Sequence, residues 1–166
     1  MKKIFAGLIV IGCCLHHQLK SQPITNRPAK NTATVPIPTG ATVLGVFDGR
    51  SPCQDIAREL NVETIPECIK IKWRLTLFQD SITQAPTEYK LEGFVYRNPP
   101  RKGKWRIVQG TKANPKAVVI QLDPDSPTKN IFLLKADQHV LFFLDKERRL
   151  MVGNENFSYT LYRTEN

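Results

Sequence analysis

The strict alternation of apolar and polar residues over 68–78 constrains the fold of this chain more than any other sequence feature. The apolar members occupy the odd positions: Ile69, Ile71, Trp73, Leu75 and Leu77. Lys70, Lys72, Arg74 and Thr76 fill the even positions between them. Successive side chains of a strand point to opposite faces, so this pattern places the whole apolar set on one face. We therefore predict a strand of an antiparallel sheet that is buried on one side and solvated on the other.

Further strand-like segments recur along the chain with turn residues between them. They span 43–47, 87–97, 104–109, 117–122, 130–136, 139–144 and 156–163. We expect turns at Asp48-Gly49, over 98–103 and over 123–127, because Gly, Pro, Asn and Asp dominate there. One helix is predicted over 51–60, with Ser51 as its N-cap and Pro52 at its first position.

This order of elements predicts an all-β fold, an antiparallel meander with one short helix. A small barrel is favoured over a sandwich, because a meander that closes on itself leaves no exposed edge. Bulky residues expected to fill such a barrel are Trp73, Tyr89, Trp105, Phe132 and Tyr159. Ile107 is expected inward with Trp105, Leu91 and Val95 inward with Tyr89, and Gly93 is expected at a bend.

The N-terminus resembles the signal of a bacterial lipoprotein. Lys2 and Lys3 precede a short apolar run over 4–11, and Val10-Ile11-Gly12-Cys13 follows the lipobox pattern: aliphatic, any, small, cysteine. Eight helical residues span about 12 Å, whereas a bilayer core is roughly 30 Å thick, so the run is too short to span a membrane. We expect residues 1–12 to be cleaved and Cys13 to carry the lipid, palmitate included, that anchors the mature chain.

Two alternatives to this anchor remain open at the sequence level. Cys14 could accept the lipid, although Cys13 would then occupy the position that favours Gly or Ala. The segment could also be an ordinary secretory signal that happens to end in two cysteines. Residues 13–42 contain four prolines and no apolar period, so we expect a disordered tether between the anchor and a folded domain at 43–166.

The charge is strongly basic, +9 for the full sequence. Removal of Lys2 and Lys3 with the signal would leave +7. Because the basic residues are spread along the chain and a secreted protein does not normally meet nucleic acid, we expect no nucleic-acid partner. Anionic lipid headgroups, envelope polysaccharide or an envelope protein are alternative contacts, and an ordinary solvated surface is the simplest interpretation.

With the strands in place, the chain from Gly45 to Arg163 resembles the N-terminal domain of the NlpE family, envelope lipoproteins named for copper resistance. The matching segments are Gly45-Val46-Phe47-Asp48-Gly49-Arg50-Ser51-Pro52-Cys53, 73–78, 87–96, Gly103-Lys104-Trp105, 119–122, 141–145 and 157–163. The resemblance implies a lipocalin-like barrel and a non-catalytic role in envelope stress sensing or copper homeostasis, with the outer membrane as the expected location. The family's second cysteine of a Cys-x-x-Cys is missing here, since the run is Cys53-Gln54-Asp55-Ile56, and we expect no second domain.

Cys53 and Cys68 are the two cysteines of the predicted domain. In an oxidising envelope such a pair most often forms a disulfide, here joining the helix to the long strand. A Cu(I) site from two thiolates and a pair of free thiols are the alternatives, and Met151 and His139 are the other soft or imidazole ligands in the domain. We expect no resident metal or other cofactor.

Catalysis is not expected, because acid–base and nucleophilic chemistry usually recruits histidine and His139 is the one histidine of the domain. Asp123-Pro124-Asp125 opens like a calcium loop but lacks the later ligands, so a hairpin loop is expected there. Two functions remain: a lipid-anchored envelope protein that senses stress or buffers copper, and a lipocalin-like carrier of a small apolar ligand.

Overall fold

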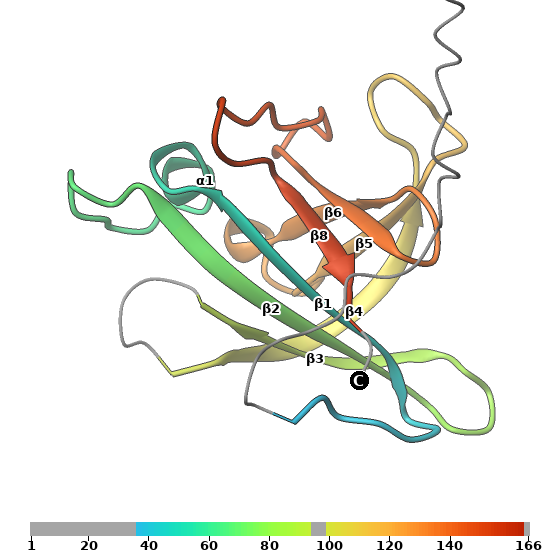
Figure 1. Cartoon of the computed structure of the whole chain (residues 1–166). Coiled ribbons are helices and arrows are strands. Elements are labelled where there is room, and N and C mark those ends of the chain that lie inside the picture. Colours follow the sequence, from blue (N-terminus) through green and yellow to red (C-terminus); the bar gives the residue numbers. More distant parts are fainter. Residues whose placement is uncertain (1–35, 94–98, 165–166) are drawn as a thin grey trace, which may run out of the picture.

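The chain forms a closed antiparallel β-barrel of eight strands that neighbour one another in chain order, as predicted (Figure 1). The structure, a computed structural model, describes residues 36–93 and 99–164. The elements are β1 (Val43–Pro52), α1 (Gln54–Glu59), β2 (Lys70–Gln79), β3 (Pro86–Glu92), β4 (Arg101–Gln109), β5 (Val118–Leu122), a 3-10 turn (Pro127–Lys129), β6 (Ile131–Lys135), β7 (Val140–Leu144) and β8 (Thr160–Arg163). β8 pairs with β1 through Phe47 and Arg163, and this pairing closes the barrel.

The interior is built from the alternation that predicted β2. Ile71, Trp73, Leu75 and Leu77 are all 4% exposed or less and belong to the main core cluster. Ile69 does not follow them: it precedes β2 and is 74% exposed, so its predicted inward position is wrong. Period two holds only where the backbone is paired, and pairing of β2 with β1 begins at Lys70.

Large aromatic side chains fill the barrel, but one of the five predicted is replaced. Trp73, Tyr89, Trp105 and Tyr159 are in the main core cluster, as expected. Phe132 is not, because its neighbours Ile131 and Leu133 take the inward positions of β6. Phe143 of β7 lies inside instead, with its ring centroid 5.3 Å from that of Trp73.

A second, smaller apolar cluster lies on the outward positions of β4 to β7. It consists of the buried Val119, Phe132 and Leu144, with the partly buried Val108 and Leu134 packed against them. Arg148, from the loop after β7, places its guanidinium 5.2 Å from the Phe132 ring centroid. The same guanidinium donates to the carbonyls of Gln109 (3.1 Å) and Gly110 (3.3 Å), so this loop crosses the outside of the sheet.

The turn predicted at Asp48-Gly49 is wrong, because both residues lie within β1. The Asp48 carboxylate accepts two hydrogen bonds of 2.8 Å from Arg74 directly across the β1–β2 pair. Gly49 faces β8, where an added Cβ would lie 2.3 Å from the Thr160 carbonyl oxygen. This segment is therefore a strand despite its turn-like composition, because it pairs with β2 and because β8 approaches it closely.

The predicted helix is shorter than expected and begins later. α1 spans Gln54–Glu59 and its N-cap is Cys53, whose side chain makes no capping hydrogen bond. Ser51 is instead in β1, where its hydroxyl accepts a 2.8 Å hydrogen bond from the Trp73 indole. α1 lies at one end of the barrel (Figure 1), where Ile56 and Leu60 join the main core cluster.

The remaining predicted strands are present, with boundaries that differ by a few residues. β4 includes Arg101–Gly103, which were expected in a turn, and β8 begins at Thr160 rather than 156. Ile107 is 52% exposed although it shares the inward set of β4 with Trp105, because it lies near the end of the strand. Val95 lies outside the described residues, while Gly93 follows β3 with φ +97°, consistent with the predicted bend.

Candidate functional site

Cys13, the predicted lipid attachment site, lies outside the described residues, as do the signal 1–12 and most of the predicted tether 13–42. Its assignment stays a prediction from the sequence. Among the residues that the structure describes, no helix is long and apolar enough to cross a membrane.

Cys53 and Cys68 form a disulfide, which settles the alternatives left open by the sequence. Their Cα atoms are 5.7 Å apart and 15 residues separate them in the chain. Cys53 immediately precedes α1 and Cys68 lies two residues before β2, so the bond ties the helix to the start of the long strand. The Thr64 hydroxyl lies 3.2 Å from the Cys53 sulfur inside the closed loop. The pair therefore holds the segment that covers this end of the barrel.

The variant Cys53→Ser/Cys68→Ser is expected to lower the free energy of unfolding by about 3 kcal/mol. The reason is the loop of 15 residues, whose closure restricts the unfolded chain by about this amount in the chain-entropy model. Urea unfolding of oxidised wild type, reduced wild type and the double variant measures the effect. The two forms without the bond should agree with each other, and equal midpoints for all three would show that the disulfide is not structural.

The two other ligand residues considered from the sequence, His139 and Met151, lie in different parts of the barrel. His139 lies between β6 and β7, at the barrel end opposite α1. Met151 packs against the main core cluster. Within residues 36–93 and 99–164, no group of three or more His, Cys, Asp or Glu side chains is placed to hold a metal ion.

A polar cluster around Asp123 joins three strands near the α1 end of the barrel. Asp123 follows β5 with φ +50°, and its carboxylate accepts hydrogen bonds from the Tyr89 hydroxyl (2.7 Å) and Arg101 Nε (2.9 Å). Arg101 also donates to the Lys129 carbonyl, across the loop between β5 and β6. Gly103 leaves room for the carboxylate, since an added Cβ would lie 1.9 Å from Asp123 Oδ1.

This cluster explains the Asp-Pro-Asp segment that resembles the start of a calcium loop. The Asp123 carboxylate accepts hydrogen bonds from Tyr89 and Arg101. The segment is a loop between two strands, as expected. Sequence reasoning missed the roles of Tyr89 and Arg101 here, because the three residues come from different strands. The positive φ of Asp123, a residue type that tolerates this region, is the one local signal.

Two buried tyrosines near this end differ in the hydrogen bonding of their hydroxyl groups. Burial, and next the hydrogen bond to Asp123, raise the pKa of Tyr89 well above its usual value. Burial raises the pKa of Tyr159 to about 12, and the nearby Asp55 acts in the same direction. Within the described residues, the Tyr159 hydroxyl makes no hydrogen bond of good geometry. Tyr159 therefore contributes mainly packing, with a weak contact to the Ile56 backbone that opposes part of the pKa shift.

Tyr159→Phe and Tyr89→Phe form a matched pair with different expected effects. Tyr159→Phe should be nearly neutral at pH 7, whereas Tyr89→Phe should cost about 1–3 kcal/mol because it removes a hydrogen bond to the charged Asp123 carboxylate, which Arg101 alone then contacts. An unfolded tyrosine titrates near pH 10 and folded Tyr159 near 12, so wild type loses stability as pH rises above 10. By pH 11 Tyr159 accounts for about 1 kcal/mol of that loss, and Tyr159→Phe should avoid this share, while the share of Tyr89 remains. Urea unfolding at pH 7 and 11 tests both predictions. If Tyr159→Phe and wild type lost the same free energy of unfolding between these pH values, the raised pKa of Tyr159 would be contradicted.

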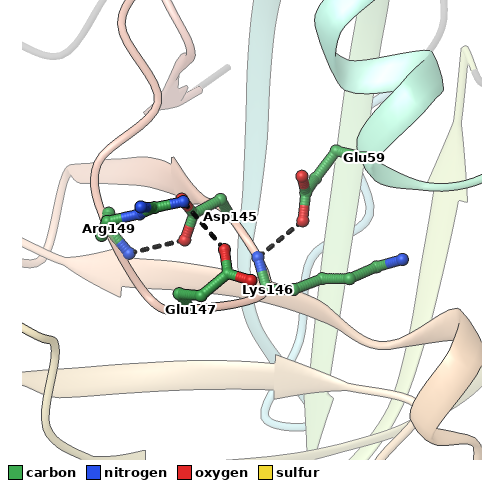
Figure 2. Close-up of polar contacts among 5 residues, drawn as sticks. All are labelled: Glu59, Asp145, Lys146, Glu147 and Arg149. Carbon is green, nitrogen blue, oxygen red and sulfur yellow. Dashed lines mark hydrogen bonds and ion pairs between the residues drawn. The ribbon is translucent and has the colours of Figure 1, made fainter.

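A charged loop at Asp145–Arg149 lies against α1, as Figure 2 shows. Glu59 of α1 accepts a 2.6 Å hydrogen bond from the Lys146 backbone N–H. Asp145 accepts from the Arg149 backbone N–H (2.8 Å) and Nε (2.6 Å). Burial opposes ionisation of Asp145, but these hydrogen bonds outweigh it and lower its pKa. The loop is thus fixed to α1 on one side and, through Arg148, to the turn after β4 on the other.

The described residues therefore combine a filled barrel, one disulfide at its α1 end and an ordered polar cluster beside it. No protein-family model, curated protein or solved structure matches this chain. Its function must accordingly be argued from its own residues.

Proposed function

We propose that this chain is a lipid-anchored, non-catalytic protein of a bacterial envelope, whose barrel senses envelope stress through its outer surface. The observation that carries the proposal is the filled interior. Trp73, Tyr89, Trp105, Phe143 and Tyr159 occupy it, each 4% exposed or less. A barrel of eight strands has an interior about wide enough for side chains or for one small ligand, and here the side chains take that place.

This filling argues against the carrier function. Small-molecule sites are usually cavities of about 300–1,000 Å³ lined by apolar side chains. In this barrel the inward leucines as well as the aromatic residues are in contact with one another in a single cluster. The end near α1 is also covered, by Ile56 and Leu60. Organic extraction of protein isolated from its membrane tests this point, and a stoichiometric small apolar molecule in the extract would favour a carrier.

Copper homeostasis receives less support than stress sensing. Both cysteine sulfurs of the domain are joined to each other, so they offer no thiolate to Cu(I) while the bond is intact. His139 lies at the opposite end of the barrel. We expect oxidised wild type and Cys53→Ser/Cys68→Ser, neither of which has a free thiol in the domain, to bind Cu(I) equally in anaerobic buffer without thiol reductants. Tighter binding by wild type would instead favour a role in copper homeostasis.

A stress-reporter assay in the native bacterium tests the sensing role. Deletion of the gene should reduce the reporter response to a perturbation of the envelope, and wild type supplied in trans should restore it. Cys13→Ser should not restore it, because the proposed sensor works at the membrane. A response that is unchanged by the deletion would contradict the proposal.

A further inference from the structure

One segment of the folded domain carries charge of a single sign, although basic residues occur along the whole chain. Between Glu92 and Asp123 the sequence contains seven lysines and arginines and no acidic residue. Strand β4 lies in this segment, and its inward positions are taken by Gly103 and by Trp105, which is 4% exposed. The alternate positions, Lys102, Lys104 and Arg106, therefore face outward, and all three are exposed. We call these three residues the basic stripe.

The stripe is only weakly compensated by its neighbours. Lys102 lies directly opposite another cation, Lys90, whose ammonium pairs with Glu92 at 2.9 Å, and Lys104 lies opposite Glu88. Like charges placed directly opposite across a strand pair are unfavourable, so this arrangement is not explained by the stability of the sheet. Within the described residues, no member of the stripe forms an ion pair. Lys112 and Lys116, both exposed, continue the basic surface on the loop after β4.

Arg106 is held in place without being neutralised. Its Nε donates a 2.8 Å hydrogen bond to the side-chain oxygen of Gln121, which lies opposite it on β5 and is 4% exposed. The Asn130 amide, oriented so that its oxygen accepts from Gln121 Nε2 at 3.1 Å, extends this contact to the loop after β5. A neutral, buried amide thus orients the guanidinium and leaves its charge available to an external anion.

The spacing of the stripe suits a surface that carries many anions. Alternate residues of a strand are about 6.6–6.8 Å apart, so three cations form a row of about 13 Å. One compact anion could not contact the whole row, whereas neighbouring headgroups of an anionic membrane could. The 30 residues of 13–42 could extend over roughly 100 Å, enough for any face of the barrel to reach the membrane that holds its anchor.

We propose that the basic stripe docks the barrel on the anionic phospholipid headgroups of the membrane to which Cys13 is attached. This inference rests on the proposed lipid anchor. Each Lys or Arg near such a surface strengthens binding by about five-fold. The tether keeps the local concentration of headgroups high, so even three contacts of this strength hold the barrel down for a large fraction of the time.

Lysine labelling of the native lipoprotein tests the docking. The full mature protein is reconstituted into vesicles of phosphatidylcholine alone or with 30% phosphatidylglycerol, treated with an amine-reactive reagent and analysed by peptide mass spectrometry. At low salt we expect Lys102 and Lys104 to react about five-fold more slowly in the anionic vesicles, with recovery in 0.5 M NaCl. Lys70 and Lys72, two strands away on β2, are the internal controls and should react equally in both.

Two matched variants sharpen the result. Arg106→Gln removes one charge of the stripe and should restore much of the labelling of Lys102 and Lys104 in anionic vesicles. Arg50→Gln removes an equally exposed charge from β1 and should leave the protection unchanged. Equal effects of the two variants would overturn the assignment to β4.

The other outcomes also decide between explanations. Equal labelling of all lysines in both vesicles would overturn the docking, and so would protection that persists in high salt. Protection by added acidic polysaccharide but not by phosphatidylglycerol would replace the membrane with a polymer partner. Flotation of the protein with phosphatidylcholine vesicles reports the anchor separately, so a failure of the anchor is distinguishable from a failure of the docking.

Discussion

Trp73→Ala is expected to lower the free energy of unfolding by about 3–5 kcal/mol, the range for removal of a large aromatic side chain from a core. Trp73 is 2% exposed, packs against the Phe143 ring and donates from its indole to Ser51. The substitution would empty the middle of the barrel and leave the Ser51 hydroxyl without this donor. Since domains of this size are stable by about 5–15 kcal/mol, this loss is a large share of the total stability.

Urea unfolding followed by circular dichroism measures this effect. Ile107→Ala is the matched control, because Ile107 belongs to the same barrel but is 52% exposed, and it should cost less than about 1 kcal/mol. Trp73→Phe should recover part of the loss by refilling some of the volume. A cost for Trp73→Ala as small as that of the control would mean that the barrel interior is not closely packed, and the argument against a carrier would then fail.

Cys13→Ser is expected to abolish membrane attachment completely. In the proposed anchor the lipid is joined to the Cys13 sulfur as a thioether, and serine has no sulfur to accept it. Each buried methylene contributes roughly 0.8 kcal/mol, so the loss of several acyl chains removes the whole basis of stable anchoring. Partition between detergent and aqueous phases, after a carbonate wash of the membranes, measures the attachment.

Cys14→Ser is the matched control for the anchor. It makes the same chemical change one residue away and should leave the protein in the detergent phase. If Cys14→Ser released the protein and Cys13→Ser did not, the lipid acceptor would be Cys14. If neither variant released it, the thioether anchor would be wrong.

The fold could be predicted where one face of a strand is buried and the other is solvated. The alternation in β2 is of this kind, and Ile71, Trp73, Leu75 and Leu77 are all inside. The inward residues of β6 could not be predicted in this way, since Ile131-Phe132-Leu133-Leu134 is apolar throughout. The reason is that the outside of this part of the barrel carries its own apolar cluster. A continuous apolar run contains no period, so it could not tell that Phe132 faces outward.

The candidate sites also differ in how far the sequence alone predicts them. Cys53 and Cys68 could be identified as a pair because they are the two cysteines of the folded domain, and the structure decided between the disulfide and its alternatives. The Asp123 cluster could not be predicted, because Tyr89, Arg101 and Asp123 meet only when β3, β4 and β5 are in register. The basic stripe could be predicted in part: the inward position of Trp105 is expected from the sequence and is confirmed, whereas Lys102 was expected in a turn rather than on β4.

We propose that the barrel is tethered to a membrane through Cys13. The mass of the mature N-terminal peptide tests this proposal most directly. The protein is purified from membranes of the bacterium, digested and analysed by mass spectrometry. We expect a first peptide that begins at Cys13 and carries diacylglycerol together with an amide-linked acyl chain. An unmodified peptide, or one that begins at another residue, would contradict it.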